Sequence, residues 1–460
     1  MNEKIEQCFG EIAINKKLVA DLKLRESRTI PSFVEEWLVA KFSDPSEQSM
    51  ETRRKITSFM AEHLPSKNDK EKIKWKLSNG NSVVILDKYT IRIDLKKGLT
   101  LVTIPSLDLT DGLVSEEVIH NNPEILVGGQ WGAGRLQVVS HGKVQAVQLI
   151  DFKPMQSGKI NLEQMVSARK NFSTSEWVDV LVRTMGCEPS AYSDRQKRYL
   201  ILRLLPMIQN NLNMMELAPK GTGKSFIFSN LSRYVWLNSG GALSEAQLFY
   251  NLSSKQLGLM ATNDVLVLDE GQSIQFKGES DIHAKFKAYL ESGEFSRGAE
   301  KVTSECGLMI LANIELHNAQ PKRLDFIREL PKMFHDDALL DRFHGIIPGW
   351  EIPRFTKDKI TTGIGLKADA FGEYLHQLRS VSDVEFPYGK TPIFGGDIRD
   401  TKAVERISSA LSKLLMLNPE DIDYEEYVLK PALELRTMVR QQISFMNPSE
   451  FSPELNVTTI

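Results

Sequence analysis

The spacing of apolar residues changes twice along the chain of 460 residues, and each change predicts a different kind of secondary structure. Up to about residue 70 the apolar positions recur at helical spacing. After Pro31, for example, Phe33 and Trp37 fall on one helix face, and Val34 and Leu38 fall beside them. This region, 1–70, is predicted to be a helical N-terminal segment.

A β-rich texture follows, in which short runs of β-branched and apolar residues are separated by turn residues. These runs lie at 82–86, 89–95, 99–104, 136–139 and 144–150. We therefore expect a β-rich domain over 71–170. By analogy with helicases it is a candidate DNA-binding barrel.

From about residue 172 helices alternate with apolar strands, which is the pattern of a parallel α/β core. A Pro/Gly-rich link at 348–353 ends this alternation, and helical periodicity returns beyond it. We therefore predict an α/β fold with a parallel sheet over 171–355, followed by a helical lid and a C-terminal tail over 356–460.

Composition adds little to this picture, with 41% hydrophobic and 25% charged residues, as in ordinary globular proteins. The cysteines Cys8, Cys187 and Cys306 are far apart, which favours a reducing compartment and offers no thiolate metal site. The charged N-terminus lacks the apolar stretch of a signal peptide, and no run reaches membrane-spanning length. We therefore predict a cytoplasmic protein that does not enter a membrane.

One stretch is markedly basic although the formal net charge is only -3. It is either a solvated helix face that runs into an edge strand or a nucleic-acid surface, and the net charge does not decide between them. Its residues are Arg53, Arg54, Lys55, Lys67, Lys70, Lys72, Lys74 and Lys76, with Trp75 among them.

A glycine-containing loop joins an apolar strand at 212–217 to a helix that starts near residue 226. It reads Pro219-Lys220-Gly221-Thr222-Gly223-Lys224-Ser225, although Ala218 stands where such loops usually have their first glycine. Glycines let backbone amides turn toward phosphate oxygens, Lys224 would hold the β- and γ-phosphates, and the Ser225 hydroxyl would ligate Mg²⁺. The loop therefore predicts a P-loop that binds ATP with Mg²⁺.

Polar residues follow the next two apolar strands. Asp269 and Glu270 end the run 264–268, where Asp269 would hold Mg²⁺ through water and Glu270 would polarise the attacking water as general base. Asn313 ends the run 307–312 and would orient that water, or it only caps a strand-to-loop turn. The order of loop, acid pair and asparagine along the chain favours catalytic roles for Asp269, Glu270 and Asn313.

Arg342 follows an apolar helical stretch and completes this order. Taken alone it would be read as a surface salt-bridge residue. An arginine at this place in a nucleotide hydrolase reaches the γ-phosphate of a neighbouring subunit and stabilises transition-state charge.

These motifs resemble those of the BrxL family, the Lon-like AAA+ ATPases of the BREX phage-defence system. The resemblance extends from about residue 170 to 435 and is carried by the runs 172–177, 216–225, 291–298, 340–344 and 347–353. It implies an AAA+ core similar to that of the minichromosome maintenance helicases. It also implies assembly with copies of itself, as a homo-hexamer or double ring that binds DNA, with other BREX proteins as candidate partners.

The resemblance also implies roles for individual residues. Asn313 corresponds to the first sensor, Arg342 to the finger that acts in trans, and Arg399 to the second sensor. Arg399 precedes the helix predicted at 403–415, so the alternative is that it only pairs with Asp397 or Asp400 at a helix start.

Residues 294–302 are predicted to form a hairpin with a glycine at its tip. In helicase-like rings a hairpin at this place points into the pore, where Arg297 and Lys301 would contact DNA phosphates in a salt-sensitive way. The alternative is an ordinary exposed turn.

The expected function is that of an ATP-hydrolysing ring motor that binds and remodels or translocates DNA in antiphage defence. Full-length family members continue into a Lon-type protease-like domain, whereas this sequence stops at Ile460, so we predict no protease activity in this chain. The alternative is a protein-unfolding ATPase that serves a Lon-type protease. This alternative is retained because an aromatic residue, Phe295, lies in the hairpin. A nucleotide switch without hydrolysis is disfavoured because Lys224, Asp269, Glu270 and Arg342 are all present.

Overall fold

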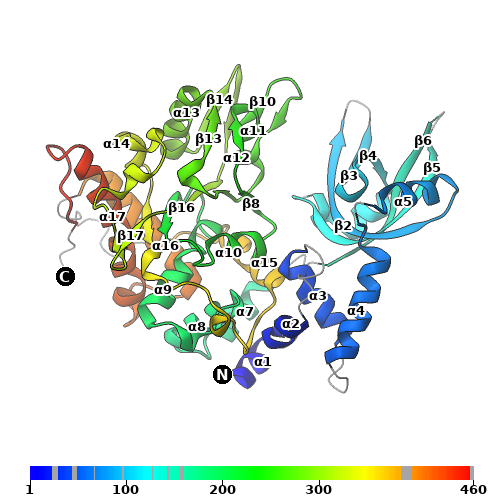
Figure 1. Cartoon of the computed structure of the whole chain (residues 1–460), viewed down its shortest axis with the longest axis horizontal. Coiled ribbons are helices and arrows are strands. Elements are labelled where there is room, and N and C mark those ends of the chain that lie inside the picture. Colours follow the sequence, from blue (N-terminus) through cyan, green and yellow to red (C-terminus); the bar gives the residue numbers. More distant parts are fainter. Residues whose placement is uncertain are drawn as a thin grey trace. The chain divides into compact units, whose positions relative to one another are not determined.

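The computed structural model of the chain forms two compact units (Figure 1). We call residues 1–11, 161–366 and 374–460 the sheet unit, and residues 12–160 and 367–373 the barrel unit. The structure describes residues 1–22, 30–43, 49–66, 68–95, 98–126, 128–141, 144–155, 160–384 and 396–455. Lys67 of the basic stretch lies outside these ranges.

A five-stranded parallel sheet forms the centre of the sheet unit, with the strand order β19-β7-β16-β12-β8. Every residue of β7, β12 and β19 is buried, as expected for strands of a parallel sheet that is covered on both faces. The bounds are β7 (Met214–Ala218), β8 (Val235–Asn238), β12 (Val265–Leu268), β16 (Gly307–Asn313) and β19 (Gly345–Pro348).

The register of the sheet decides which residues share an edge. Ala218 at the end of β7 pairs with Asn313 at the end of β16, and Gly345 at the start of β19 pairs with Met214 at the start of β7. We call the edge where the strands end the carboxyl edge and the opposite edge the amino edge.

The sheet unit also contains most of the helices, and serine and aspartate caps begin several of them. Ser173 and Glu176 form a capping box at α8, because each side chain accepts a hydrogen bond from the backbone N–H of the other. The helices are α1 (Asn2–Phe9), α7 (Leu162–Arg169), α8 (Thr174–Thr184), α9 (Asp194–Leu202), α10 (Lys224–Asn230), α11 (Glu245–Leu248), α12 (Leu259–Thr262), α13 (Glu279–Ser292), α14 (Asp337–Leu340), α16 (Ile398–Leu415) and α17 (Lys430–Met446). Helix α15 (Ala368–Leu378) spans the division between the units.

The sheet unit also contains short strand pairs. The pairs β10–β11, β14–β15 and β17–β18 are antiparallel hairpins. The bounds of the short strands are β9 (Ala242–Ser244), β10 (Tyr250–Asn251), β11 (Gln256–Leu257), β13 (Gln275–Lys277), β14 (Glu294–Arg297), β15 (Glu300–Thr303), β17 (Leu316–His317), β18 (Gln320–Pro321) and β20 (Ile364–Leu366).

Helix α1 belongs to the sheet unit, although the sequence pattern grouped it with the other helices of 1–70. The ring of Phe9 stacks on Phe172 at 5.8 Å and on Trp177 at 5.9 Å between centroids. The aromatic contacts therefore join α1 to residues more than 160 positions away, which local periodicity does not reveal.

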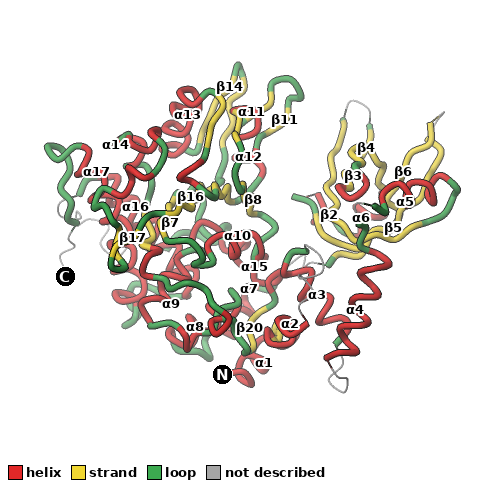
Figure 2. Tube along the Cα trace, viewed as in Figure 1, coloured by secondary structure: helices red, strands yellow, loops and turns green. Residues whose placement is uncertain are grey.

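The barrel unit is built on a closed barrel with the strand order β2-β3-β4-β6-β5 (Figure 2). β4 and β6 pair in parallel, the other neighbours pair antiparallel, and α6 lies between β4 and β5 in the chain. This is the strand order of an oligonucleotide/oligosaccharide-binding (OB) fold. The strands are β2 (Val83–Asp94), β3 (Leu99–Ile104), β4 (Leu109–Val114), β5 (Gln130–His141) and β6 (Val144–Pro154).

Two details of this unit differ from the sequence prediction. The runs at 82–86 and 89–95 are one continuous strand, β2, and the basic stretch ends in helix α5, not in an edge strand. The remaining elements are β1 (Ala13–Asn15), α2 (Lys16–Leu22), α3 (Ser32–Phe42), α4 (Ser49–His63), α5 (Lys70–Ser78) and α6 (Glu116–Asn121). None of the helices in the described residues has the length and apolarity needed to cross a membrane.

Candidate nucleotide site

The loop between β7 and α10 has the backbone conformation that its glycines permit. Gly221 and Gly223 have φ angles of 85° and 77°, in the left-handed region that favours glycine. The N–H of Phe355 donates to the Gly221 carbonyl at 2.8 Å. Pro219 is half-buried and Lys220 is exposed, so the loop lies at the surface while its two ends are anchored.

A buried ion pair lies beneath this loop. Arg203 is 1% exposed and Glu216 is fully buried, and their side chains form two hydrogen bonds of 2.6 and 2.9 Å. The same guanidinium donates to the Thr222 carbonyl at 3.2 Å. The pair therefore ties strand β7 to the loop. Sequence reasoning missed it, although a single glutamate within the apolar run of β7 was a signal.

Lys224 begins α10 and directs its ammonium back toward the end of β7. Its Nζ donates to the carbonyls of Ala218 and Pro219 at 3.4 and 3.2 Å, and to Oδ1 of Asn313 at 3.0 Å. Burial lowers its pKa, against the opposing effect of the carboxylates of Glu216, Asp269 and Glu270. Within the described chain this cation forms no salt bridge, which leaves its charge available for an anion.

The acid pair and Asn313 meet Lys224 at the carboxyl edge. Asp269 follows β12, and its N–H donates to the Asn238 carbonyl at 2.9 Å. Glu270 has a left-handed φ of 54°, and its Oε2 accepts from Nδ2 of Asn313 at 3.2 Å. Asn313 therefore connects the Lys224 ammonium to the Glu270 carboxylate.

Gln272 supports this connection and was not foreseen from the sequence. Its amide donates to Glu270 Oε2, and its Oε1 accepts from the backbone N–H of Asn313 at 2.8 Å. Since Gln272 comes only two residues after Glu270 and contacts a residue 41 positions away, its role depends on the pairing of β12 with β16.

The residues at this edge fit a phosphate anion with a divalent cation. Lys224 is a buried ammonium without a salt bridge in the described chain, and the buried Oγ1 of Thr222 has no hydrogen-bond partner there. The Ser225 hydroxyl in the first turn of α10 and the Asp269 carboxylate are oxygen donors, the kind of ligand that Mg²⁺ takes.

Arg342 and Arg399 lie elsewhere. His344, two residues after Arg342, pairs its backbone with Asn213 just before β19 and β7 begin, which places Arg342 near the amino edge. Nε of Arg342 lies 3.0 Å from Oε2 of Glu291, and Nη2 of Arg399 lies 3.2 Å from the same oxygen. Within one chain, the two arginines are therefore together and are separated from Lys224 by the length of the sheet.

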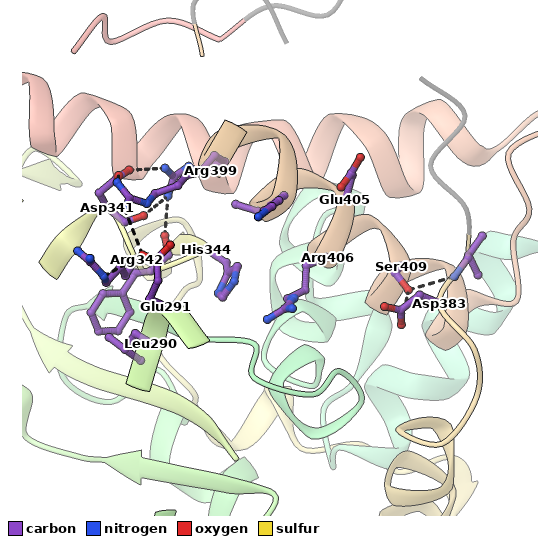
Figure 3. Close-up of a pocket in the computed structure, with 15 residues that line it drawn as sticks. Leu290, Glu291, Asp341, Arg342, His344, Asp383, Arg399, Glu405, Arg406 and Ser409 are labelled. Atoms are coloured by element: carbon purple, nitrogen blue, oxygen red, sulfur yellow. Dashed lines mark hydrogen bonds and ion pairs between the residues drawn. The ribbon is translucent and has the colours of Figure 1, made fainter. Parts of the chain in front are cut away.

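A cavity of about 620 Å³ lies beside these arginines (Figure 3). In the view, Arg342 and Arg399 point toward Glu291, and Arg406 lies further along α16. Arg399, Lys402 and Arg406 follow each other at helical spacing in α16 and line the cavity, so its wall carries several cations.

Arg399 itself is placed differently from the prediction. It lies in the first turn of α16, which starts at Ile398, not before the helix. Its backbone N–H donates to the capping carboxylate of Asp397 at 2.7 Å, whereas its side chain pairs with Asp341 at 3.1 Å and with Glu291.

The predicted hairpin forms, as β14–β15. Arg297 is held inside the chain, because its guanidinium donates to the Tyr250 carbonyl and pairs with Glu245 at 3.3 Å. The Lys301 side chain is 66% exposed and pairs with Glu294 at 2.7 Å. Phe295 is only 3% exposed and packs on Phe249 and Tyr289, so it belongs to the core.

Two models of known protein families match the chain. Residues 147–456 match the model of the "Lon-like protease BrxL-like, ATPase domain", and residues 7–138 match that of the "BREX system Lon protease-like protein BrxL N-terminal". The chain thus carries a BrxL-type ATPase domain behind a BrxL-type N-terminal domain. It belongs to the BrxL family.

Two relatives show how much of such a protein the chain represents. The Lon-like protease BrxL of Escherichia coli O9:H4 (strain HS) is 32% identical over 459 residues, which cover 97% of this chain and 65% of the relative. The Lon-like protease BrxL of Bacillus cereus (strain H3081.97) is 30% identical over 464 residues, which cover 98% of this chain and 68% of the relative. The chain therefore spans about two thirds of the length of these relatives.

Proposed function

We propose that this chain is a Mg²⁺-dependent ATP-hydrolysing motor of the AAA+ P-loop type that acts on DNA as a BREX component. The observation that carries the proposal is the link from Lys224 through Asn313 to Glu270. It joins a phosphate-binding cation to a carboxylate suited to general-base chemistry at the edge of a parallel sheet where ligands bind.

Each residue at the carboxyl edge then has a role. The loop from Pro219 to Ser225 holds the phosphates, with Lys224 as the cation and its glycines allowing close approach. Ser225 and Asp269 hold Mg²⁺, which when bound neutralises developing phosphate charge. Glu270 accepts the proton of the attacking water, and Asn313 orients that water through its amide.

The separation of Arg342 and Arg399 from Lys224 supports assembly with copies of the same chain. An arginine that stabilises transition-state charge must reach the phosphates, and within one chain these two lie toward the opposite edge of the sheet. We therefore assign both to the nucleotide of an adjacent subunit in a homo-hexameric or double ring. The side chain of Glu291 pairs with both of them within one chain.

Two features support DNA as the substrate. The barrel has the strand order of OB folds, many of which bind oligonucleotides, and the β14–β15 hairpin carries the exposed Lys301. The burial of Phe295 removes the aromatic residue that would grip a polypeptide, which disfavours the alternative of a protein-unfolding ATPase. On this basis the chain remodels or translocates DNA, and other BREX proteins are its candidate partners.

Steady-state ATP hydrolysis tests the proposal when double-stranded DNA, single-stranded DNA or an unfolded protein is added over a salt series. We expect stimulation by DNA that decreases as salt rises, because contacts to phosphates release counterions. Stimulation by the polypeptide alone would move the chain to the unfolding class, and absence of hydrolysis with Mg²⁺ and ATP would refute the motor.

A further inference from the structure

Arg436 on α17 is a fully buried arginine whose donors are all directed at the segment around Arg342 and at α16. Its exposure is 0%. A buried guanidinium is stable only where carboxylates and carbonyls satisfy it, so its partners show what it holds in place.

Two of its partners are the backbone carbonyls on either side of Arg342. Nη1 of Arg436 donates to the carbonyl of Asp341 at 2.9 Å and to that of Phe343 at 2.7 Å. The peptide unit before Arg342 and the one after Phe343 are thereby held against α17. Since the backbone is held on both sides of Arg342, the direction in which its side chain leaves the backbone is restricted as well.

The other partners connect Arg436 to Arg399. Nη2 donates to Oδ1 of Asp341 at 2.5 Å, and the second oxygen of this buried carboxylate accepts from Arg399 at 3.1 Å. Nε donates to Asp400, the residue that follows Arg399, at 2.6 Å. A single guanidinium therefore contacts the chain neighbours of both arginines.

We propose that Arg436 is a positioning residue that aligns Arg342 and Arg399 for the nucleotide of the adjacent subunit. The inference rests on the proposed function, since it requires that these two arginines act in trans. Arg436 touches no nucleotide itself and acts through Asp341, Phe343 and Asp400. Through Arg436, α17 is thus tied to the chain neighbours of both arginines.

Lysine cannot replace Arg436 in this arrangement. It keeps the positive charge but has a compact ammonium in place of a planar fork with five donors, so it cannot hold two carbonyls and two carboxylates at once. In R436K we expect kcat for ATP to fall on the order of 10- to 100-fold, as for a misplaced catalytic group. We expect KM for ATP to stay within about twofold, because the loop from Pro219 to Ser225 is untouched.

A matched control is R379K. Arg379 is also a buried arginine of the sheet unit that donates to two backbone carbonyls, those of Pro206 and Glu305, at 3.0 and 2.6 Å. Loss of the planar guanidinium in R379K should lower the free energy of unfolding without a selective loss of kcat. An equal loss of kcat in R379K would show that the effect of R436K is general destabilisation.

Mixing of subunits separates positioning in trans from damage to the chain's own site. R436K subunits mixed with K224A subunits should recover ATP turnover above that of either alone, because each K224A subunit supplies an intact Arg342 to the Lys224 site of an R436K neighbour. No recovery, or R436K turnover equal to that of the unmodified protein, would overturn the proposal.

A second mixture, of R342A with K224A, distinguishes this failure from failure of the proposed function. If neither mixture recovers although assembly is confirmed, the shared site itself is refuted. If only the R342A mixture recovers, the role of Arg436 is refuted. If R436K does not fold, D341N, which keeps the side-chain volume and breaks the ion pairs with Arg436 and Arg399, is mixed with K224A under the same criteria.

Discussion

The side-chain amide of Asn313 donates a hydrogen bond to the carboxylate of Glu270 at 3.2 Å, and thereby joins the ends of β16 and β12. The carboxylate is thus held in place by a neutral amide. A carboxylate that is oriented in this way and exposed is suited to accept a proton from water.

E270Q tests the assignment of the base. We expect the variant to bind ATP with nearly unchanged affinity and to lose on the order of 100-fold or more in kcat, because the amide keeps the shape and cannot accept the proton. Nucleotide binding by fluorescence titration and hydrolysis by phosphate release measure the two quantities. Hydrolysis at the unmodified rate would remove Glu270 from the mechanism.

The ion pair beneath the loop predicts an asymmetric effect on stability. E216Q leaves the Arg203 guanidinium buried with less compensation, so we expect a loss of about 3 kcal/mol in the free energy of unfolding. The double variant R203M/E216L, which removes both charges, should lose less than E216Q. Urea unfolding followed by circular dichroism compares them, and equal losses in both variants would show that packing, not the unpaired charge, causes the effect.

The sequence predicted those residues of the candidate site that directly follow the strands β7, β12 and β16. The loop after 212–217, the acids after 264–268 and the asparagine after 307–312 follow apolar runs, and parallel strands end at one edge, so their meeting follows from the α/β pattern alone. That Asn313 lies between Lys224 and Glu270 is due to the strand order, because β16 lies between β7 and β12 in the sheet although it is the last of the three in the chain, and the α/β pattern does not predict this order.

Contacts between distant segments were not predictable. The partners of Gln272, Arg203 and Arg436 are set by how strands and helices pack, and nothing in the local sequence around Arg436 indicates a buried guanidinium. The same reason applies to Arg297. The hairpin sequence predicted that its side chain contacts DNA phosphates, whereas in the structure the side chain pairs with Glu245. In the barrel unit, local runs indicated strands, but the parallel pairing of β4 with β6 joins segments 35 residues apart.

The hairpin assignment predicts a salt-dependent role for Lys301. K301A should weaken DNA binding and lower the slope of log affinity against log salt by about one, since one phosphate contact is lost. K322A is the matched control, because Lys322 has a 63% exposed side chain and pairs with Glu315 at 2.7 Å, as Lys301 pairs with Glu294. Fluorescence anisotropy over a salt series measures both. If K301A and K322A behave alike, the hairpin has no special contact with DNA, and the basic α4 and α5 helices become the better candidates.

His344 predicts the pH dependence of stability. It is half-buried and accepts the N–H of Asn213 through Nδ1 at 3.0 Å. Burial, with Arg406 and Arg436 nearby, lowers its pKa from 6.5 to about 3. The unfolded chain therefore binds a proton between pH 6.5 and 3 that the folded chain does not. The stability that His344 contributes is complete above pH 6.5 and is lost as the pH falls, by about 2 kcal/mol at pH 5.

H344N isolates this contribution. The asparagine oxygen can accept the Asn213 N–H but does not titrate, so the variant should lose less stability than the unmodified chain between pH 7.5 and pH 5. Denaturant unfolding at the two pH values measures the difference for each protein. Carboxylates elsewhere also titrate in this range, but they are the same in both chains and do not enter the comparison. An identical pH dependence in both proteins would show that the pKa of His344 is the same in the folded and the unfolded chain, and would contradict the lowered pKa of His344.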